Sequence, residues 1–100
     1  MPLDTLQARG RLLALFDRYA ALLTEHQREV MDLHIRSDWS LAEIAAHQKT
    51  SRAAVHDIVR RSTHALQDYE KRLGLLAEEA RRQREIEALK RQIARLEGTA

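Results

Sequence analysis

The order of apolar and polar residues along the chain predicts a protein built of α-helices. From about residue 4 to Leu23, apolar side chains recur at spacings of three, four and seven, which is the period of one face of a helix. A second row of leucines and a tyrosine widens that face. We therefore expect a first helix over 4–23 whose broad apolar side needs another element to cover it.

Two capping boxes mark the beginnings of the next helices. In this motif, a Ser or Thr and a Glu or Gln three residues later each bond the backbone N–H of the other. Thr24 with Gln27 has this spacing, and so does Ser40 with Glu43. These signals predict one helix that ends near residue 35 and a shorter one that ends near residue 47.

The segment after the second capping box predicts a helix-turn-helix. About four residues separate the helix over 41–47 from Ser51, which is a suitable N-cap for the next helix. Two short helices joined by such a turn form this motif, and we assign it to 41–61. Trp39 directly precedes the capping serine of the first of these helices, where an apolar residue commonly packs on the helix start.

The helix that follows the turn carries a seam of apolar residues at heptad spacing. The steps of three and four run from Val55 to Ala80, over about three and a half repeats. The pattern fails over 78–85, which is polar on all sides, and restarts at Ile86 in a different phase. We expect one helix to continue through this phase break, because residues 77–97 are good or tolerable helix formers. A polar hinge before a separate tail helix is the alternative.

The residue composition supports an all-α fold. Ala, Leu, Arg, Glu and Lys supply 56 of the 100 residues, while the chain has three Gly and one Pro. The formal net charge is only +2, although the pI is 9.4. Nine basic and ten acidic side chains lie before residue 71, so the excess positive charge belongs to the last 30 residues. The pI is therefore no evidence that the first 70 residues bind DNA.

The sequence lacks the signatures of a membrane protein, a metalloprotein or an enzyme. No stretch approaches roughly 18 consecutive apolar residues, and the first residues form no secretory signal, so we expect a cytoplasmic protein without membrane insertion. There is no cysteine, and no two of the five histidines are three or four residues apart, so we expect no metal site. Without a Gly-rich phosphate loop or a catalytic arrangement, we expect a non-catalytic protein that needs no cofactor.

A family resemblance rests on several motifs in a fixed order. The segment SLAEIAAHQKTSRAAVHDIVRR resembles region four of bacterial sigma factors, which reads promoter DNA through a helix-turn-helix. With the flanking motifs LLTEHQRE and DYEKRLGLL, residues 12–76 more closely resemble the YlxM family. Members of that family are small all-helical proteins associated with the signal recognition particle (SRP). The combination of motifs is fairly specific, whereas each alone would be weak.

The resemblance implies a regulatory protein that contacts SRP RNA, the SRP GTPase or both. It also implies a sigma region four-like head and dimerisation through the C-terminal helix. We accordingly divide the chain into a helical head over 1–65 and a dimerisation helix with a charged extension over 66–100. Lys49 departs from the family, which usually has a glycine here in a left-handed turn, and a lysine costs about 1 kcal/mol more in that conformation.

The exposed side of the expected recognition helix supplies the candidate nucleic-acid contacts, because arginine suits both guanine edges and phosphates. Asp57 lies among these residues and weakens the positive footprint. A head that serves as a scaffold for protein or ribonucleoprotein contacts therefore stays open. A DNA-binding transcription regulator and a coiled-coil adaptor that uses the tail are the competing classes. The candidate contacts are Lys49, Arg52, His56, Arg60 and Arg61.

The C-terminal half of the heptad seam supplies a candidate homodimer interface. A helix that extends beyond a compact head has no surface of its own chain to cover its seam, unless the first helix folds back over it. A two-fold dimer would cover the seam, and packing on the helix over 4–23 is the alternative. Farther on, glutamates interleave with the basic residues of 81–95, which favours a solvated or coiled-coil face over a basic arm for RNA or acidic lipid. The candidate dimer contacts are Leu66, Tyr69, Leu73 and Leu76.

Overall fold

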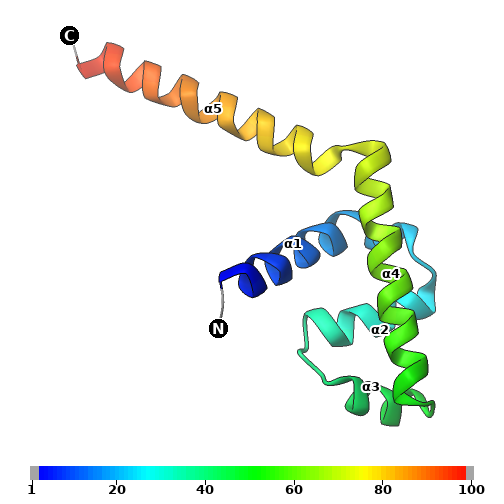
Figure 1. Ribbon diagram of the computed structural model, residues 1–100. Helices are drawn as coiled ribbons and strands as arrows, with labels where there is room; N and C mark the ends of the chain where they lie inside the picture. Colours follow the sequence, from blue (N-terminus) through cyan, green and yellow to red (C-terminus); the bar gives the residue numbers. More distant parts are fainter. Residues whose placement is uncertain (1–2, 99–100) are drawn as a thin grey trace.

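A computed structural model describes residues 3–98, and these residues form helices and no strand, which confirms the all-α prediction. Helices α1 to α4 form a head, and α5 projects from it (Figure 1). A short 3-10 turn, η1, follows α1 where the sequence predicts four more residues of α-helix. The elements are α1 (Leu3–Tyr19), η1 (Ala20–Leu22), α2 (Glu25–Ile35), α3 (Leu41–Gln48), α4 (Arg52–Leu73) and α5 (Leu75–Gly98).

Local hydrogen bonds begin α2, α3 and α4 where the sequence predicts. The Thr24 hydroxyl accepts a bond from the Gln27 backbone N–H at 3.1 Å, and the Gln27 amide oxygen accepts one from the Thr24 N–H at 3.1 Å. Ser40 and Glu43 form the same reciprocal pair. The Ser51 hydroxyl caps α4. Both capping-box predictions are confirmed. The bonds satisfy N–H groups that the first turn of a helix leaves without partners.

The turn between α3 and α4 contains a left-handed residue at the place that the family resemblance implies. Lys49 has φ 56° and ψ 48°, a conformation that suits glycine better than a residue with a Cβ. Its N–H donates to carbonyl groups in the last turn of α3, and the Thr50 N–H donates to the Ala45 carbonyl at 3.0 Å. These bonds close the C-terminus of α3 and direct the chain into α4.

Helix α4 lies at the centre of the head, because α1, α2 and α3 all pack on it. Near its beginning, Val55 is buried with Val30 of α2 and Ile44 of α3. Farther along, Leu66 is buried against α1 and α2, and Val59 contacts both groups of core residues. The apolar stripe of α4 is thus covered by its own chain. The group around Leu66 consists of Leu15, Phe16, Tyr19, Leu23, Met31 and Leu66.

The helix continues through the phase break over 78–85 as expected, but the single long helix expected after the turn is interrupted earlier, at Gly74. This glycine has φ 62° and ψ 25°, which ends α4, and α5 begins at the next residue. The polar stretch over 78–85, where the alternative hinge was expected, is regular helix inside α5. The heptad seam from Val55 to Ala80 therefore belongs to two helices that run in different directions (Figure 1).

Side chains from α1 and α4 stabilise the bend by bonding the first N–H groups of α5. The Tyr19 hydroxyl accepts a bond from the Leu75 N–H at 3.1 Å and donates one to the Glu70 carboxylate at 2.6 Å. Glu70 also accepts bonds from the next two N–H groups of α5 at 3.0 and 3.3 Å. The hydrogen bond from Tyr19 lowers the pKa of Glu70, and burial raises the pKa of Tyr19. A charged carboxylate is favourable at this place because it faces a helix N-terminus.

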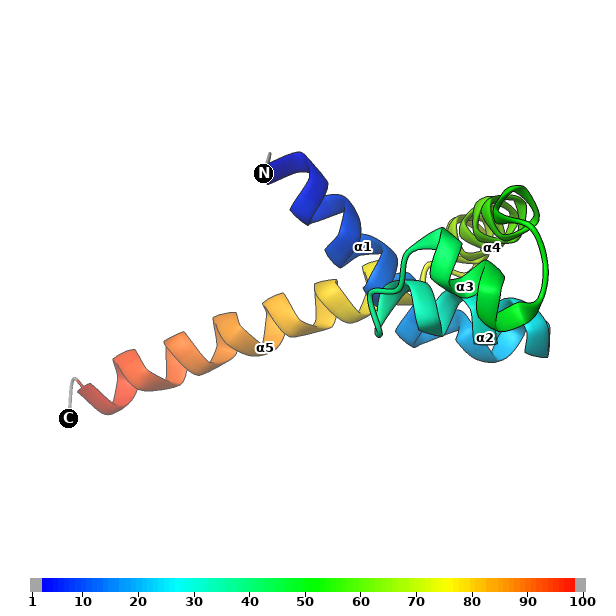
Figure 2. The ribbon, with the colours of Figure 1, turned by 90° about the horizontal axis from the view of Figure 1, so that it is seen from below.

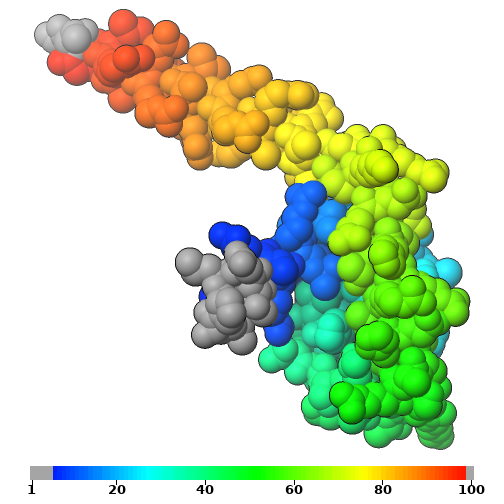
Figure 3. Space-filling model, viewed as in Figure 1, coloured from blue at the N-terminus to red at the C-terminus, as the bar shows by residue number. Residues whose placement is uncertain are grey.

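The direction of α5 makes the molecule elongated. Its extents are 67 × 31 × 19 Å, and its radius of gyration is 18.6 Å, whereas a compact domain of this length has about 13 Å. At the base of α5, Leu75 and Leu76 pack on the core, and Glu79 pairs with Arg18 of α1 at 3.1 Å. Figure 2 shows the rest of α5 extending away from the head as a single helix, and Figure 3 shows it protruding from the head.

Candidate nucleic-acid interface

Helix α3, the turn and the beginning of α4 form a helix-turn-helix whose second helix is open to solvent. The cap at Ser51 determines where α4 begins, and the burial of Val55 determines which side of it faces the core. Arg52 and His56 are exposed in the first turns, and together with Leu41 of α3 they border a shallow groove. A recognition helix in this motif offers its first turns to base edges. This surface is therefore the candidate interface.

The cations predicted for this surface fall into two groups. Lys49 and Arg52 form no ion pair within residues 3–98, whereas Asp57 holds Arg60 at 2.8 Å and Arg61 at 2.5 Å. The hydrogen bond from Arg60 and the charge of Arg61 lower the pKa of Asp57. The carboxylate is therefore ionised at neutral pH and offsets positive charge that a phosphate would otherwise meet.

The residues predicted for the dimer interface differ in burial, and most of them pack on the core of their own chain. Leu66 is fully buried, so it has no surface for a second molecule. This corrects the expectation for Leu66: α1 folds back over α4, which is the alternative that the broad apolar side of α1 suggests. Tyr69 packs on the same core and donates from its hydroxyl to the Leu22 carbonyl at 3.2 Å. Leu76 also packs on the core, whereas Leu73 is 53% exposed.

The distal part of α5 carries exposed apolar side chains. They are spaced by three and four residues, and each is between 45% and 69% exposed. Their spacing places them on one side of the helix. We call this set the tail seam; it consists of Ile86, Leu89, Ile93 and Leu96.

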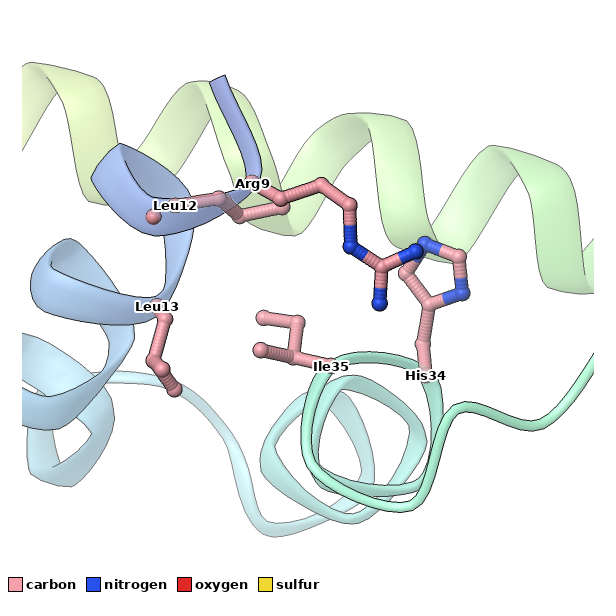
Figure 4. Close-up of a pocket in the computed structure, with 6 residues that line it drawn as sticks. Arg9, Leu12, Leu13, His34 and Ile35 are labelled. Atoms are coloured by element: carbon pink, nitrogen blue, oxygen red, sulfur yellow. The ribbon is translucent and has the colours of Figure 1, made fainter. Parts of the chain in front are cut away.

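A small hollow lies between α1 and α2. Its volume is about 220 Å³, below the roughly 300 Å³ at which small-molecule sites begin. Figure 4 shows Arg9 extending toward the His34 ring, with Ile35 beside them. The Arg9 guanidinium is paired with Asp38 at 2.9 Å. We therefore assign no binding role to this hollow.

The remaining candidate groups have structural surroundings. Trp39 packs with the core residues around Ile44, and its ring lies 5.3 Å from the ring of His47, which confirms the packing role at the start of α3. The part of the chain that the structure describes holds no cluster of three or more His, Asp or Glu suited to a metal ion. None of the helices described there is long and apolar enough to cross a membrane.

Sequence reasoning missed the contact between Tyr19 and Glu70 at the base of α5. The two residues are 51 positions apart, so no local pattern links them. Gly74, four residues after Glu70, was the one available signal for a helix end. Because a glycine inside a helix costs only about 1 kcal/mol, that signal does not separate a break from continuity.

Comparison with known proteins identifies the family. The family model UPF0122, described as "Putative helix-turn-helix protein, YlxM / p13 like", matches residues 6–99. A UPF0122 protein of Symbiobacterium thermophilum is 47% identical over 90 residues, which cover 90% of this chain and 84% of that protein. A UPF0122 protein of Geobacillus kaustophilus is 45% identical over 93 residues, which cover 93% and 84% of the two chains.

A third relative, from Clostridium kluyveri, is 51% identical over 73 residues, which cover 73% of this chain and 66% of that protein. The matched region of the family model includes the helix-turn-helix and α5 in addition to α1 and α2. The resemblance drawn from the motifs is therefore confirmed over most of the chain. On these findings, the chain belongs to the UPF0122 family of YlxM / p13-like helix-turn-helix proteins.

Proposed function

We propose that this chain is a non-catalytic regulatory protein of the SRP pathway, located in the cytoplasm, whose head contacts SRP RNA, the SRP GTPase or both. The motifs over residues 12–76 support the pathway, because the YlxM resemblance implies it. The helix-turn-helix supports a nucleic-acid contact, because its second helix is open to solvent. An effect on GTP hydrolysis would act through the partner.

The observation that carries the proposal is the open beginning of α4. Arg52 and His56 are exposed there, and the exposed Lys49 precedes them in the turn. A guanidinium without a carboxylate partner is free to donate paired hydrogen bonds to phosphate oxygens or to guanine. We assign these three residues as the primary contacts. Arg60 and Arg61 join them only when a phosphate displaces their own carboxylate partner.

The test is recovery of partners with the tagged full chain from cell extract, followed by titration of an SRP RNA transcript. We expect Arg52→Ala to weaken RNA binding by about 1–3 kcal/mol. As a control, Arg72→Ala removes a cation that is already paired with Asp68 at 3.0 Å at the far end of α4. That control should leave the affinity within about twofold. Recovery of neither SRP RNA nor its GTPase contradicts the proposal.

A DNA-binding transcription regulator is the second candidate, because a helix-turn-helix with an open second helix also fits a major groove. A dimer of such heads would select a palindrome with half-sites about one helical turn apart. Binding selection from random duplex DNA decides between the two candidates. An enriched palindrome that Arg52→Ala no longer binds supports the regulator, and the absence of any enriched motif removes it.

We further propose a homodimer in which the tail seam forms a parallel two-stranded coiled coil. The seam has isoleucines at heptad position a and leucines at position d, which favours this assembly. In the same register, Glu85 at position g faces the partner's Lys90 at position e, and symmetry repeats this attractive pair. Leu73, the most exposed of the four residues first expected at the interface, is the last residue of α4, two residues before α5 begins.

Sedimentation of the full chain over a range of concentrations tests the dimer. Leu89→Lys should give a monomer, whereas Ala80→Lys, at position b outside the tail seam, should leave the dimer intact. Glu85→Lys should weaken the dimer, and adding Lys90→Glu should restore it. Because the chain has no cysteine, Leu96→Cys reports orientation directly: a rapid disulfide between two chains requires parallel helices. A wild-type chain that stays monomeric at high concentration contradicts the dimer.

A further inference from the structure

One side of α5 carries arginines with no carboxylate among them. With Ile86 at heptad position a, positions c and f lie on the side of the helix opposite the tail seam. Between residues 77 and 95 these positions hold four arginines and two alanines, while the glutamates of α5 occupy other positions. We call this set the outer arginine face; it consists of Arg81, Arg84, Arg91 and Arg95.

The outer arginine face is exposed and has no partner within residues 3–98. Every residue from 81 to 98 is exposed, and no ion pair of the described chain involves these four guanidinium groups. In the head, by contrast, Arg36 holds Asp17 at 2.6 Å. The first and last arginines of the face are 14 residues apart, so the row is about 21 Å long at 1.5 Å per residue.

Small residues leave space for a ligand between the arginines. Ala88 and Ala94 line a shallow hollow together with Arg91 and Arg95. An anion in this hollow would lie against the helix between two guanidinium groups. Because guanidinium groups donate paired hydrogen bonds to phosphate oxygens, the hollow and its rim suit phosphate groups.

The positions of the glutamates distinguish between two anionic partners. A helix that lies on acidic lipid buries its apolar side and keeps cations beside that side. On α5, Glu85 and Glu97 flank the tail seam against a single cation, Lys90, whereas the outer arginine face points the opposite way. A lipid surface would therefore meet carboxylates. A nucleic-acid backbone needs no apolar contact and carries a charge every 1.7 Å or so along a duplex, so it matches a long row of arginines.

We propose that the outer arginine face of α5 binds the phosphate backbone of double-stranded nucleic acid, as a second contact surface beside the helix-turn-helix. This inference rests on the proposed function, because both surfaces serve nucleic acid, but it uses no residue of the head. The contact positions the duplex without reading its sequence. It supplies electrostatic affinity that the head, with paired arginines, provides only weakly. The face lies opposite the tail seam, so both helices of the dimer present it.

The test measures binding of the full chain to RNA and DNA duplexes of about 24 base pairs, a little over two helical turns, over a range of salt. Replacing all four arginines of the face by glutamine should reduce the steepness of the salt dependence, which is the absolute slope of log affinity against log salt on DNA, by about three to four. The Arg84→Gln, Arg91→Gln variant should lower it by about two. Replacing all four by lysine should retain most of the slope, because the charges remain.

A control variant and a comparison with Arg52→Ala distinguish a contact by this surface from a contact by the head. Arg9→Gln with Arg72→Gln removes two ion-paired cations of the head and should leave the slope unchanged. An unchanged slope in the four-glutamine variant overturns the inference. If Arg52→Ala still weakens binding in that case, the proposed function stands. A slope that falls in the tail variants while Arg52→Ala binds normally supports this surface and contradicts the head contact.

Binding to lipid vesicles tests the competing partner, and two further measurements show whether the variants keep their structure. Binding of the wild type to phosphatidylglycerol vesicles but to neither duplex, lost in the four-glutamine variant, would assign the face to lipid and overturn the inference. Circular dichroism and sedimentation show whether the helix and the dimer survive the substitutions. If the four-glutamine variant does not fold, the slope of the two-glutamine variant decides the question by the same criteria.

Discussion

The head and the distal part of α5 use the same residue types in opposite ways. In the head, Leu66 and Val55 are fully buried, and Arg60 and Arg61 hold a carboxylate. Along distal α5, the tail seam is about half exposed, and the outer arginine face has no carboxylate partner in the described chain. These core residues and these two arginines of the head therefore find their partners within residues 3–98, in contrast to Lys49 and Arg52 at the helix-turn-helix. The exposed side chains of α5 are the basis of the two contacts proposed for it, with a second copy of the chain and with a duplex.

The largest expected effect compares a buried leucine of the head with an exposed leucine of α5. Leu66→Ala should lower the free energy of unfolding of the head by about 2–5 kcal/mol, because it leaves a cavity in the core. Leu89→Ala should leave that free energy unchanged in the monomer, since the side chain is 57% exposed. Urea denaturation followed by the fluorescence of Trp39, the one tryptophan, measures both. Equal losses for the two variants would mean that α5 packs on the head.

The second prediction concerns the bond network that joins the two regions. Tyr19→Phe keeps the buried ring but removes the hydroxyl that accepts from the Leu75 N–H and donates to Glu70. We expect faster hydrogen exchange at the first amides of α5, with little change at the first amides of α2. Unchanged exchange at the base of α5 would show that the bend depends on Gly74 alone.

The same network should respond to acid. The pKa of Glu70 is lowered in the folded protein, mainly by the hydrogen bond from Tyr19. Its contribution to stability is therefore fully present above the ordinary glutamate pKa of about 4.3, and it is lost as pH falls through the lowered folded-state pKa. Hydrogen exchange at the base of α5 should accelerate over that acidic range in the wild type. Glu70→Gln should remove this pH dependence.

The turn of the helix-turn-helix offers a smaller effect in the stabilising direction. Lys49→Gly should raise the free energy of unfolding by about 1 kcal/mol, because the residue has φ 56° and glycine adopts this conformation without strain. Ala46→Gly, inside α3, should lower it by about 0.5–1 kcal/mol. Thermal denaturation of both variants checks the sign. A destabilised Lys49→Gly protein would contradict the left-handed assignment.

The smallest expected effect comes from removing the carboxylate that pairs with two arginines of the head. Asp57→Asn releases Arg60 and Arg61 from their shared carboxylate and makes the head resemble the outer arginine face. We expect a few-fold gain in duplex affinity and a steeper salt dependence, by up to about two in slope. Little change in Tm is expected, because exposed ion pairs contribute little. Fluorescence anisotropy measures the affinity, and a loss of binding would mean that Asp57 itself positions the contact.

Much of the fold follows from short-range patterns in the sequence. Capping boxes such as Thr24 with Gln27 involve residues three apart, so both partners of each bond can be recognised within a short stretch of sequence. The period of apolar residues predicts which side of each helix is buried, and it identified Val55 and Leu66 as seam residues correctly. The candidate cations were also visible, but their pairing with Asp57 depends on side-chain geometry along α4.

What the sequence by itself determined is therefore the presence of the helices of the head, the N-terminal ends of α2, α3 and α4, and the apolar sides of these helices, because hydrogen bonds and periodicity within a few residues encode them. Only the tertiary structure decided which partner covers each apolar side and where the long helix ends. Leu66 is covered by α1 rather than by a second chain, and Gly74 breaks the helix where Tyr19, 51 residues before Glu70, completes the cap of α5. These choices depend on residues far apart in sequence, which meet only once the head has packed.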